Sequence, residues 1–197
     1  MKKLVVATQN RDKFEEMREA LSGLGWEIVP GFGFPGVPEV VEDGSTLEEN
    51  SLKKAREVSK FTALPALSDD TGLFVDALNG QPGIYAARFA GEKCTYEDNV
   101  RKMLGLLEGV PRDKRRALFR TVISIYYPDG SPQQVSGEVE GSITMGSRGS
   151  GGFGYDSIFQ PYGSSKVFAE MCLEEKNKIS HRGKALQKAR ELLKSDF

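Results

Sequence analysis

Residues 117–130 read ALFRTVISIYYPDG, a run of β-branched and aromatic side chains that ends in a turn. Such side chains favour strands, and Pro-Asp-Gly favours a reversal of the chain. Val135, Val139 and Ile143 follow the turn and predict a returning strand with a bend at a glycine. The stretch therefore predicts a long hairpin, which gives the sheet an antiparallel component.

Outward from this hairpin, strand and helix patterns alternate. Short apolar runs predict strands at residues 4–7, 26–29, 73–77 and 157–160. Helical spacing of apolar residues follows the capping residues Asn10, Thr46 and Thr95, and it recurs over residues 185–193. The alternation predicts an α/β fold over residues 1–197 as a single domain. We expect a mixed, elongated central β-sheet flanked by helices, in two lobes around a cleft.

Composition narrows the class of protein. The 197 residues carry a net charge of −1, which argues against a general binder of nucleic acid or membranes. Only four apolar residues follow Met-Lys-Lys before polarity returns, which is too few for a signal peptide or a membrane span. Cys94 and Cys172 have no C-x-x-C partner and predict reduced thiols. We therefore expect a cytoplasmic protein with no nucleic-acid or membrane partner.

Two adjacent carboxylates, Asp69 and Asp70, lie within the apolar stretch ALPALSDDTGLFV at residues 63–75. A buried charge requires a compensating cation, and Mg²⁺ prefers carboxylate oxygen. Glu42 is a candidate further ligand for such a metal ion. The alternative is a surface turn, SDDTG, between two strands. This segment by itself favours neither interpretation.

The segment Thr8–Lys13 follows a predicted strand and opens a predicted helix. Backbone N–H groups and the helix dipole favour an anion at such a position, and Lys13 adds a full positive charge. The spacing is not that of a Walker loop. Taken alone, the segment favours an ordinary N-cap with a solvated lysine.

Two later segments carry further candidate ligand-binding groups. The glycine-rich loop GSGGFGYD at residues 149–156 offers Phe153 for stacking on a base and Asp156 as an acceptor. Its alternative is a flexible bend whose aromatic residues belong to the core. The segment KNKISHRGK at residues 176–184 offers Lys176, His181 and Arg182 as cationic donors, and its alternative is a solvated helix start.

Four segments occur in the order found in one protein family. They read VATQNRDK at residues 6–13, SDDTGL at 68–73, GGFGYD at 151–156 and KNKISHR at 176–182. EDGST at residues 42–46 and NGQPGIYAAR at 79–88 fit the same pattern. Over nearly its whole length the chain resembles the inosine triphosphate pyrophosphatase family.

The resemblance implies hydrolysis of ITP, dITP and XTP to the monophosphate and pyrophosphate. It also implies dependence on Mg²⁺, a homodimer, and an active site in the cleft between two lobes. Asp70 would be the catalytic proton acceptor and a metal ligand, Glu42 a second metal ligand, and Asp69 a catalytic support. The phosphates and sugar would be held by Thr8, Gln9, Asn10, Arg11, Asp12, Lys13, Thr71 and Lys176. The base pocket would contain Phe153, Gly154, Tyr155, Asp156, His181 and Arg182.

Some features depart from the family pattern or leave alternatives open. Gln9 stands where glycine is frequent, Ser157 stands where proline is usual, and Glu39 or Asp43 is an alternative to Glu42. How guanine would be excluded stays open. A nucleotide-binding module without turnover is the second functional hypothesis, and the paired carboxylates disfavour it. A binder of single-stranded RNA is a third, and the near-neutral charge disfavours it.

Overall fold

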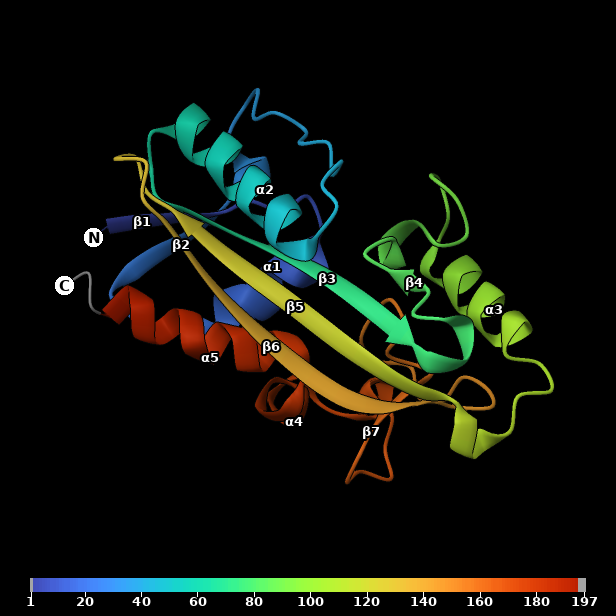
Figure 1. Ribbon diagram of the computed structural model, residues 1–197. Coiled ribbons are helices and arrows are strands. Elements are labelled where there is room, and N and C mark those ends of the chain that lie inside the picture. The colour runs from blue at the N-terminus through green and yellow to red at the C-terminus, as the bar shows by residue number, and fades with distance from the viewer. Residues whose placement is uncertain (1, 195–197) are drawn as a thin grey trace. The chain divides into compact units, whose positions relative to one another are not determined.

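The computed structural model describes residues 2–194 and contains a seven-stranded mixed sheet in that part of the chain (Figure 1). The strand order is β2-β1-β3-β5-β6-β7, and β4 pairs with β3. β1 lies parallel to β2 and β3, whereas the pairs β3–β4 and β6–β7 are antiparallel. The predicted α/β class with a mixed sheet is confirmed. The strands are β1 (Lys2–Val6), β2 (Trp26–Pro30), β3 (Ala66–Val75), β4 (Pro82–Gly83), β5 (Arg116–Tyr126), β6 (Pro132–Ile143) and β7 (Phe159–Pro161).

Helices begin where the sequence places their capping residues. Asn10 Oδ1 accepts the N–H of Lys13, and Thr46 Oγ1 accepts the N–H of Glu49. Thr95 and Asp98 form a complete capping box. These contacts satisfy backbone N–H groups that a helix start leaves open. The helices are α1 (Arg11–Ala20), α2 (Leu47–Thr62), α3 (Tyr96–Leu106), α4 (Leu173–Ile179) and α5 (His181–Lys194).

Contacts between Cα atoms divide the chain into two compact units. Unit 1 comprises the described residues of Met1–Asp70, Thr121–Gly137 and His181–Phe197. Unit 2 comprises Thr71–Arg120 and Glu138–Ser180. The strands β3, β5 and β6 therefore each contribute residues to both units.

The core of unit 1 lies on both faces of β1. Leu4 and Val6 pack with the apolar faces of α1 and α5, whereas Val5 packs with Ala66 and with Val58 of α2. Successive side chains of a strand point to opposite faces, so this burial requires helices on both sides. Figure 1 shows α2 on one side of β1 and α5 on the other.

The core of unit 2 is rich in aromatic side chains. Phe119 lies 4.6 Å from Phe159, and Phe159 lies 5.3 Å from Phe168, measured between ring centroids. α3 adds Val100 and Met103 to this cluster. The packed rings give the loops around them a firm support.

β3 runs without interruption through the two aspartates. Asp69 is 1% exposed and Asp70 is 5% exposed, so the surface-turn interpretation of this segment is wrong. The bounds predicted for the strand at residues 73–77 are also wrong. β3 begins seven residues earlier, at Ala66, and ends at Val75. Residues 157 and 158 belong to a turn, and β7 begins only at Phe159.

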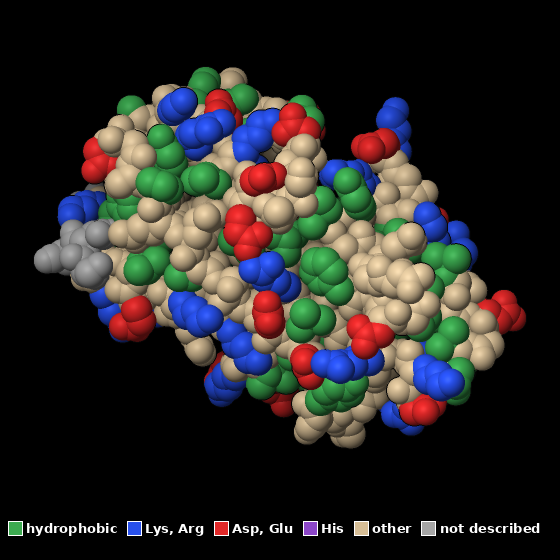
Figure 2. Space-filling model, in the orientation of Figure 1, with side chains coloured by type: hydrophobic (Ala, Val, Ile, Leu, Met, Phe, Trp, Pro, Cys, Tyr) green, Lys and Arg blue, Asp and Glu red, His purple; other side chains and the backbone are tan. Residues whose placement is uncertain are grey.

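Charged side chains of both signs are interspersed on the face drawn in Figure 2. Among residues 2–194, no helix combines the length and the apolar character needed to cross a bilayer.

Gly137 of β6 sets a close approach to α5 within unit 1. A Cβ atom at this position would lie 2.2 Å from the carbonyl oxygen of His181 and 2.5 Å from the backbone nitrogen of Ala185. Both atoms are backbone, so the first turn of α5 would have to move. We expect Gly137→Ala to lower the free energy of unfolding by about 1–3 kcal/mol, as overpacking does.

Urea unfolding of Gly137→Ala tests this close approach. Gly105→Ala in α3 is the matched control, because a Cβ there meets nothing within 4 Å. We expect that control to be neutral or to gain up to about 1 kcal/mol. Equal stability of Gly137→Ala and the unaltered protein would contradict the packing described.

Candidate active site

Asp69 lies at the centre of a buried ion-pair cluster in unit 1. Its Oδ2 atom accepts from Nε and Nη2 of Arg182 at 3.1 and 3.0 Å, and Lys13 Nζ lies 3.3 Å from the carboxylate. Burial alone would raise the pKa of Asp69, but Lys13 and Arg182 outweigh burial and hold that pKa well below its usual range. Asp69 is therefore ionised at neutral pH, and its carboxylate contacts both Arg182 and Lys13.

Glu16 of α1 is a member of this cluster that the sequence did not reveal. Arg182 Nη1 donates to Glu16 Oε2 at 2.5 Å, and both side chains are buried. The available signal is the position of Glu16 beside Met17 on the apolar side of α1, but Glu15 and Arg18 give the same stretch a polar appearance. All three guanidinium nitrogens of Arg182 thus contact carboxylates.

Asp70 has a different environment from its neighbour. Lys54 Nζ lies 3.3 Å from Asp70 Oδ1 and also contacts Glu42 Oε1. Asp70 Oδ2 is buried and accepts no hydrogen bond within the described structure. Burial raises the pKa of Asp70, and Lys54 only partly opposes this effect. Asp70 is consequently the more basic carboxylate of the pair, as a proton acceptor requires.

Lys54 was not predicted, although helical spacing contains the signal for it. Ser51, Ala55 and Val58 form the buried side of α2, and Lys54 lies three residues after Ser51 on that side. Burial opposes the charge on Lys54, but Asp70 and Glu42 outweigh it and raise the pKa of the ammonium group. Lys54 therefore stays charged between two carboxylates.

The residues around Asp70 suit a metal ion that is shared with a phosphate substrate. An unsatisfied, buried carboxylate oxygen beside a second carboxylate offers a place for a cation. Mg²⁺ is commonly held by one or two carboxylates, phosphate oxygens and water. Among residues 2–194, no group of three or more His, Cys, Asp or Glu side chains is arranged to hold a metal ion. The donor set therefore fits a shared cation and not a closed protein cage.

The two acids that are alternatives to Glu42 as a metal ligand are both exposed. Asp43 is exposed and pairs with Lys53 at 2.6 Å, and Glu39 is exposed. Only Glu42 of these three acids contacts Lys54, which also holds Asp70. The geometry therefore favours the assignment of Glu42 over its two alternatives.

The turn after β1 orients Lys13. The N–H of Asn10 donates to Thr8 Oγ1 at 3.1 Å, and Asn10 Oδ1 caps α1 through the N–H of Lys13. Lys13 then reaches Asp69. The other residues of the segment Thr8–Lys13 are exposed, namely Gln9, Arg11 and Asp12.

In unit 2, the glycine-rich loop folds around Asp156. Asp156 Oδ2 accepts the backbone N–H of Phe153 at 2.9 Å and Lys176 Nζ at 2.6 Å. The same ammonium group lies 4.7 Å from the centroid of the Phe153 ring. Gly152 has a φ of +69°, and a Cβ there would lie 2.2 Å from Asp156 Oδ2, so the loop requires glycine at this point.

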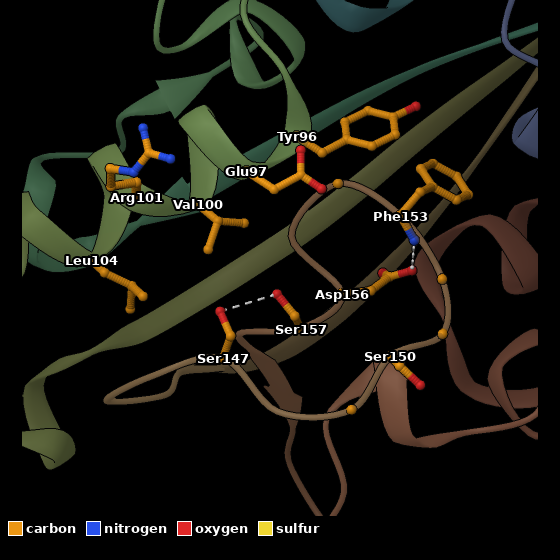
Figure 3. Close-up of a pocket in the computed structure, with 14 residues that line it drawn as sticks. Tyr96, Glu97, Val100, Arg101, Leu104, Ser147, Ser150, Phe153, Asp156 and Ser157 are labelled. Atoms are coloured by element: carbon orange, nitrogen blue, oxygen red, sulfur yellow. Dashed lines mark hydrogen bonds between the residues drawn. The ribbon is translucent and has the colours of Figure 1, made fainter.

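A cavity of about 500 Å³ adjoins this loop (Figure 3). Phe153, Gly154 and Asp156 line it, together with residues from α3. Tyr155 does not line it, because its ring is buried and its hydroxyl group donates to the carbonyl oxygen of Ala86. The structure thus gives Tyr155 a place in the core of unit 2.

The residues predicted to form a base pocket are divided between the two units. Phe153, Gly154, Tyr155 and Asp156 belong to unit 2, as do Thr71 and Lys176, which were predicted to hold the phosphates and sugar. His181 and Arg182 begin α5 in unit 1, where both are buried. A contact of these last two residues with a base stays a prediction.

The chain is thus an α/β protein whose sheet carries a buried pair of carboxylates in unequal environments. The model of the Ham1 family matches residues 4–192, so the chain belongs to that family. This confirms the family resemblance predicted from the four ordered segments.

Individual relatives match over nearly their whole length. The dITP/XTP pyrophosphatase of Desulforamulus reducens is 50% identical over 191 residues, which cover 97% of this chain and 95% of the relative. That of Geobacter sulfurreducens is 48% identical over 94% of both chains. The structure of a HAM1 protein from Coxiella burnetii superimposes with a TM-score of 0.89 at 40% identity, covering 99% of this chain and 100% of that one.

Proposed function

We propose that this protein hydrolyses nucleoside triphosphates of deaminated purines, namely ITP, dITP and XTP, to the monophosphate and pyrophosphate. This activity removes such nucleotides from the pool. The observation that carries the proposal is the buried Asp70 carboxylate beside Lys54 and Glu42, with one oxygen that accepts no hydrogen bond from residues 2–194. The names of the relatives at 50% and 48% identity support the substrate class. The whole chain acts as one pyrophosphatase domain.

The cluster in unit 1 supplies the chemistry at phosphorus. Water attacks the α-phosphorus, Asp70 accepts its proton, the bond from the α-phosphorus to the bridging oxygen breaks, and pyrophosphate leaves. Lys13 and Lys54 stabilise the charge that develops on the phosphate oxygens. Mg²⁺, when held by Asp70 and Glu42, supplies further charge neutralisation to the triphosphate.

The cavity in unit 2 supplies base recognition. Hypoxanthine and xanthine present an oxygen acceptor at position 6 and an N–H donor at position 1, whereas adenine presents the reverse. Asp156 lines the cavity as an acceptor, Lys176 donates to Asp156, and both side chains are buried. Adenine would present its N–H donor to Lys176 and its ring acceptor to Asp156, so neither group would gain a hydrogen bond to it, and adenine is disfavoured. Phe153 contributes stacking on either base.

Incubation with XTP or dITP and Mg²⁺ tests the proposed activity. We expect pyrophosphate and the monophosphate in equal amounts, much slower turnover of ATP, and complete loss of turnover when EDTA removes the metal ion. Orthophosphate with a nucleoside diphosphate as products would contradict the position of cleavage. Binding of nucleotide without any turnover would favour the regulatory-module hypothesis instead.

Assembly and location belong to the same proposal. The family resemblance implies a homodimer, and the free thiols of Cys94 and Cys172 support a cytoplasmic location, where thiols stay reduced. Light scattering coupled to gel filtration measures the assembly, and a monomeric mass would contradict the dimer.

A further inference from the structure

Two aromatic rings lie side by side at the wall of the cavity in unit 2. The centroids of Tyr96 and Phe153 are 5.8 Å apart, and their planes are tilted by 38°. Figure 3 shows the two rings next to each other, one from the start of α3 and one from the glycine-rich loop. Phe153 belongs to the proposed base site, whereas the sequence gives Tyr96 no assigned role.

Tyr96 is held firmly at its backbone and exposed at its ring. It is the first residue of α3, directly after the capping box in which Thr95 Oγ1 accepts the N–H of Asp98 and the Asp98 carboxylate accepts the N–H of Thr95. Its side chain is nevertheless 38% exposed. Tyr96 therefore lines the cavity and is partly exposed to solvent, and its ring is not part of the buried core.

The surroundings of Phe153 limit where a base can stack. Lys176 Nζ lies over the Phe153 ring, so an ammonium group covers part of that ring. The two rings are tilted to each other, and Phe153 and Tyr96 are both among the residues that line a cavity of about 500 Å³. Bases stack on aromatic side chains with free energies at least comparable to those of contacts between two aromatic side chains, so a base that stacks here replaces the ring–ring contact without loss.

We propose that Tyr96 is the second aromatic wall of the base site and contacts the purine ring that stacks on Phe153. This inference rests on the proposed function and deepens it. Tyr96 contacts the base and not the reacting phosphorus, so its contribution is to binding. Its hydroxyl group is not required, because the wall is formed by the ring.

Steady-state kinetics with XTP distinguish this role from a purely structural one. We expect Tyr96→Ala to raise KM about five- to tenfold with kcat within about twofold of the unaltered protein, as loss of uniform binding does. Tyr96→Phe retains the ring and keeps the original KM, whereas Tyr96→Leu retains bulk without the ring and raises KM. Tyr162→Ala is the matched control, because Tyr162 is 56% exposed and lines a different cavity of unit 2.

Binding of the product, xanthosine monophosphate, measured by calorimetry in the presence of EDTA, provides a readout without turnover. We expect Tyr96→Ala to weaken this binding by a similar factor, with an unchanged circular dichroism spectrum. Equal KM and equal binding for Tyr96→Ala and the unaltered protein, or full recovery by Tyr96→Leu, would overturn the inference while leaving the activity in place. Absence of pyrophosphate release from the unaltered protein would overturn the proposed function, and the binding measurement would still test Tyr96.

Discussion

Asp70→Asn is expected to lower kcat for XTP by at least about 10³-fold, while the protein stays folded. Loss of a general base by itself costs about 10²–10⁴-fold, and the same change also weakens a metal ligand. Folding survives because the native environment already disfavours the ionised form of Asp70, whose pKa is raised by burial. A neutral side chain of the same shape therefore removes chemistry and not stability.

Asp43→Asn is the matched control for this substitution. Asp43 lies next to Glu42 in sequence, but its exposed side chain pairs with Lys53. We expect its kcat to remain within about twofold of the unaltered value, since surface ion pairs contribute little. Pyrophosphate release and the midpoint of thermal unfolding are measured for both variants. Unchanged turnover in Asp70→Asn would contradict the role of Asp70 as proton acceptor. A loss of turnover that is accounted for by unfolding of the variant would also contradict it.

The elements that the sequence predicts well are those with local signals. The hairpin of β5 and β6 follows from β-branched residues and a Pro-Asp-Gly turn, and the helix starts follow from Asn10, Thr46 and Thr95. At each of these helix starts the stabilising contact lies within three residues of the capping residue. Periodicity and capping therefore suffice to locate the element.

β3 shows what local signals leave undetermined. Two adjacent aspartates interrupt the apolar pattern, which by itself does not decide between a surface turn and a buried site, and the strand continues through them. The cations that compensate them come from α1, α2 and α5, as Lys13, Lys54 and Arg182. No pattern within the strand contains these partners, because they are brought in by the fold and not by the neighbouring sequence.

The candidate site also contains residues that local sequence patterns do not identify. Asp70 and the Phe153–Asp156 loop are identifiable from residue type and order. The sequence does not single out Lys54, because Lys53 beside it has the same chemistry. Only the register of α2 makes Lys54 the more buried of the two lysines. Arg182 was predicted for a base pocket, whereas the structure places its guanidinium group against Asp69 and Glu16.

Arg182→Ala is expected to produce a large loss of stability. It removes the cation that contacts both Asp69 and Glu16, each of which is almost fully buried. Breaking a buried ion pair by removing one partner costs about 3–5 kcal/mol, because it leaves buried charge without compensation. At about 2–4 °C per kcal/mol for a chain of this length, the midpoint of thermal unfolding falls by roughly 6–20 °C.

Arg18→Ala is the control for this loss, because Arg18 pairs with Glu15 at the surface of α1, the helix that carries Glu16, and contributes at most about 0.5 kcal/mol. Coupling is measured with the double variant Arg182→Ala and Glu16→Gln. If Arg182 acts by compensating the Glu16 carboxylate, neutralising Glu16 recovers part of the loss, and the double variant is more stable than the sum of the two single effects by at least about 1 kcal/mol. Strict additivity would show that the two side chains are not coupled. A midpoint for Arg182→Ala equal to that of Arg18→Ala would show that the buried cluster does not depend on its arginine.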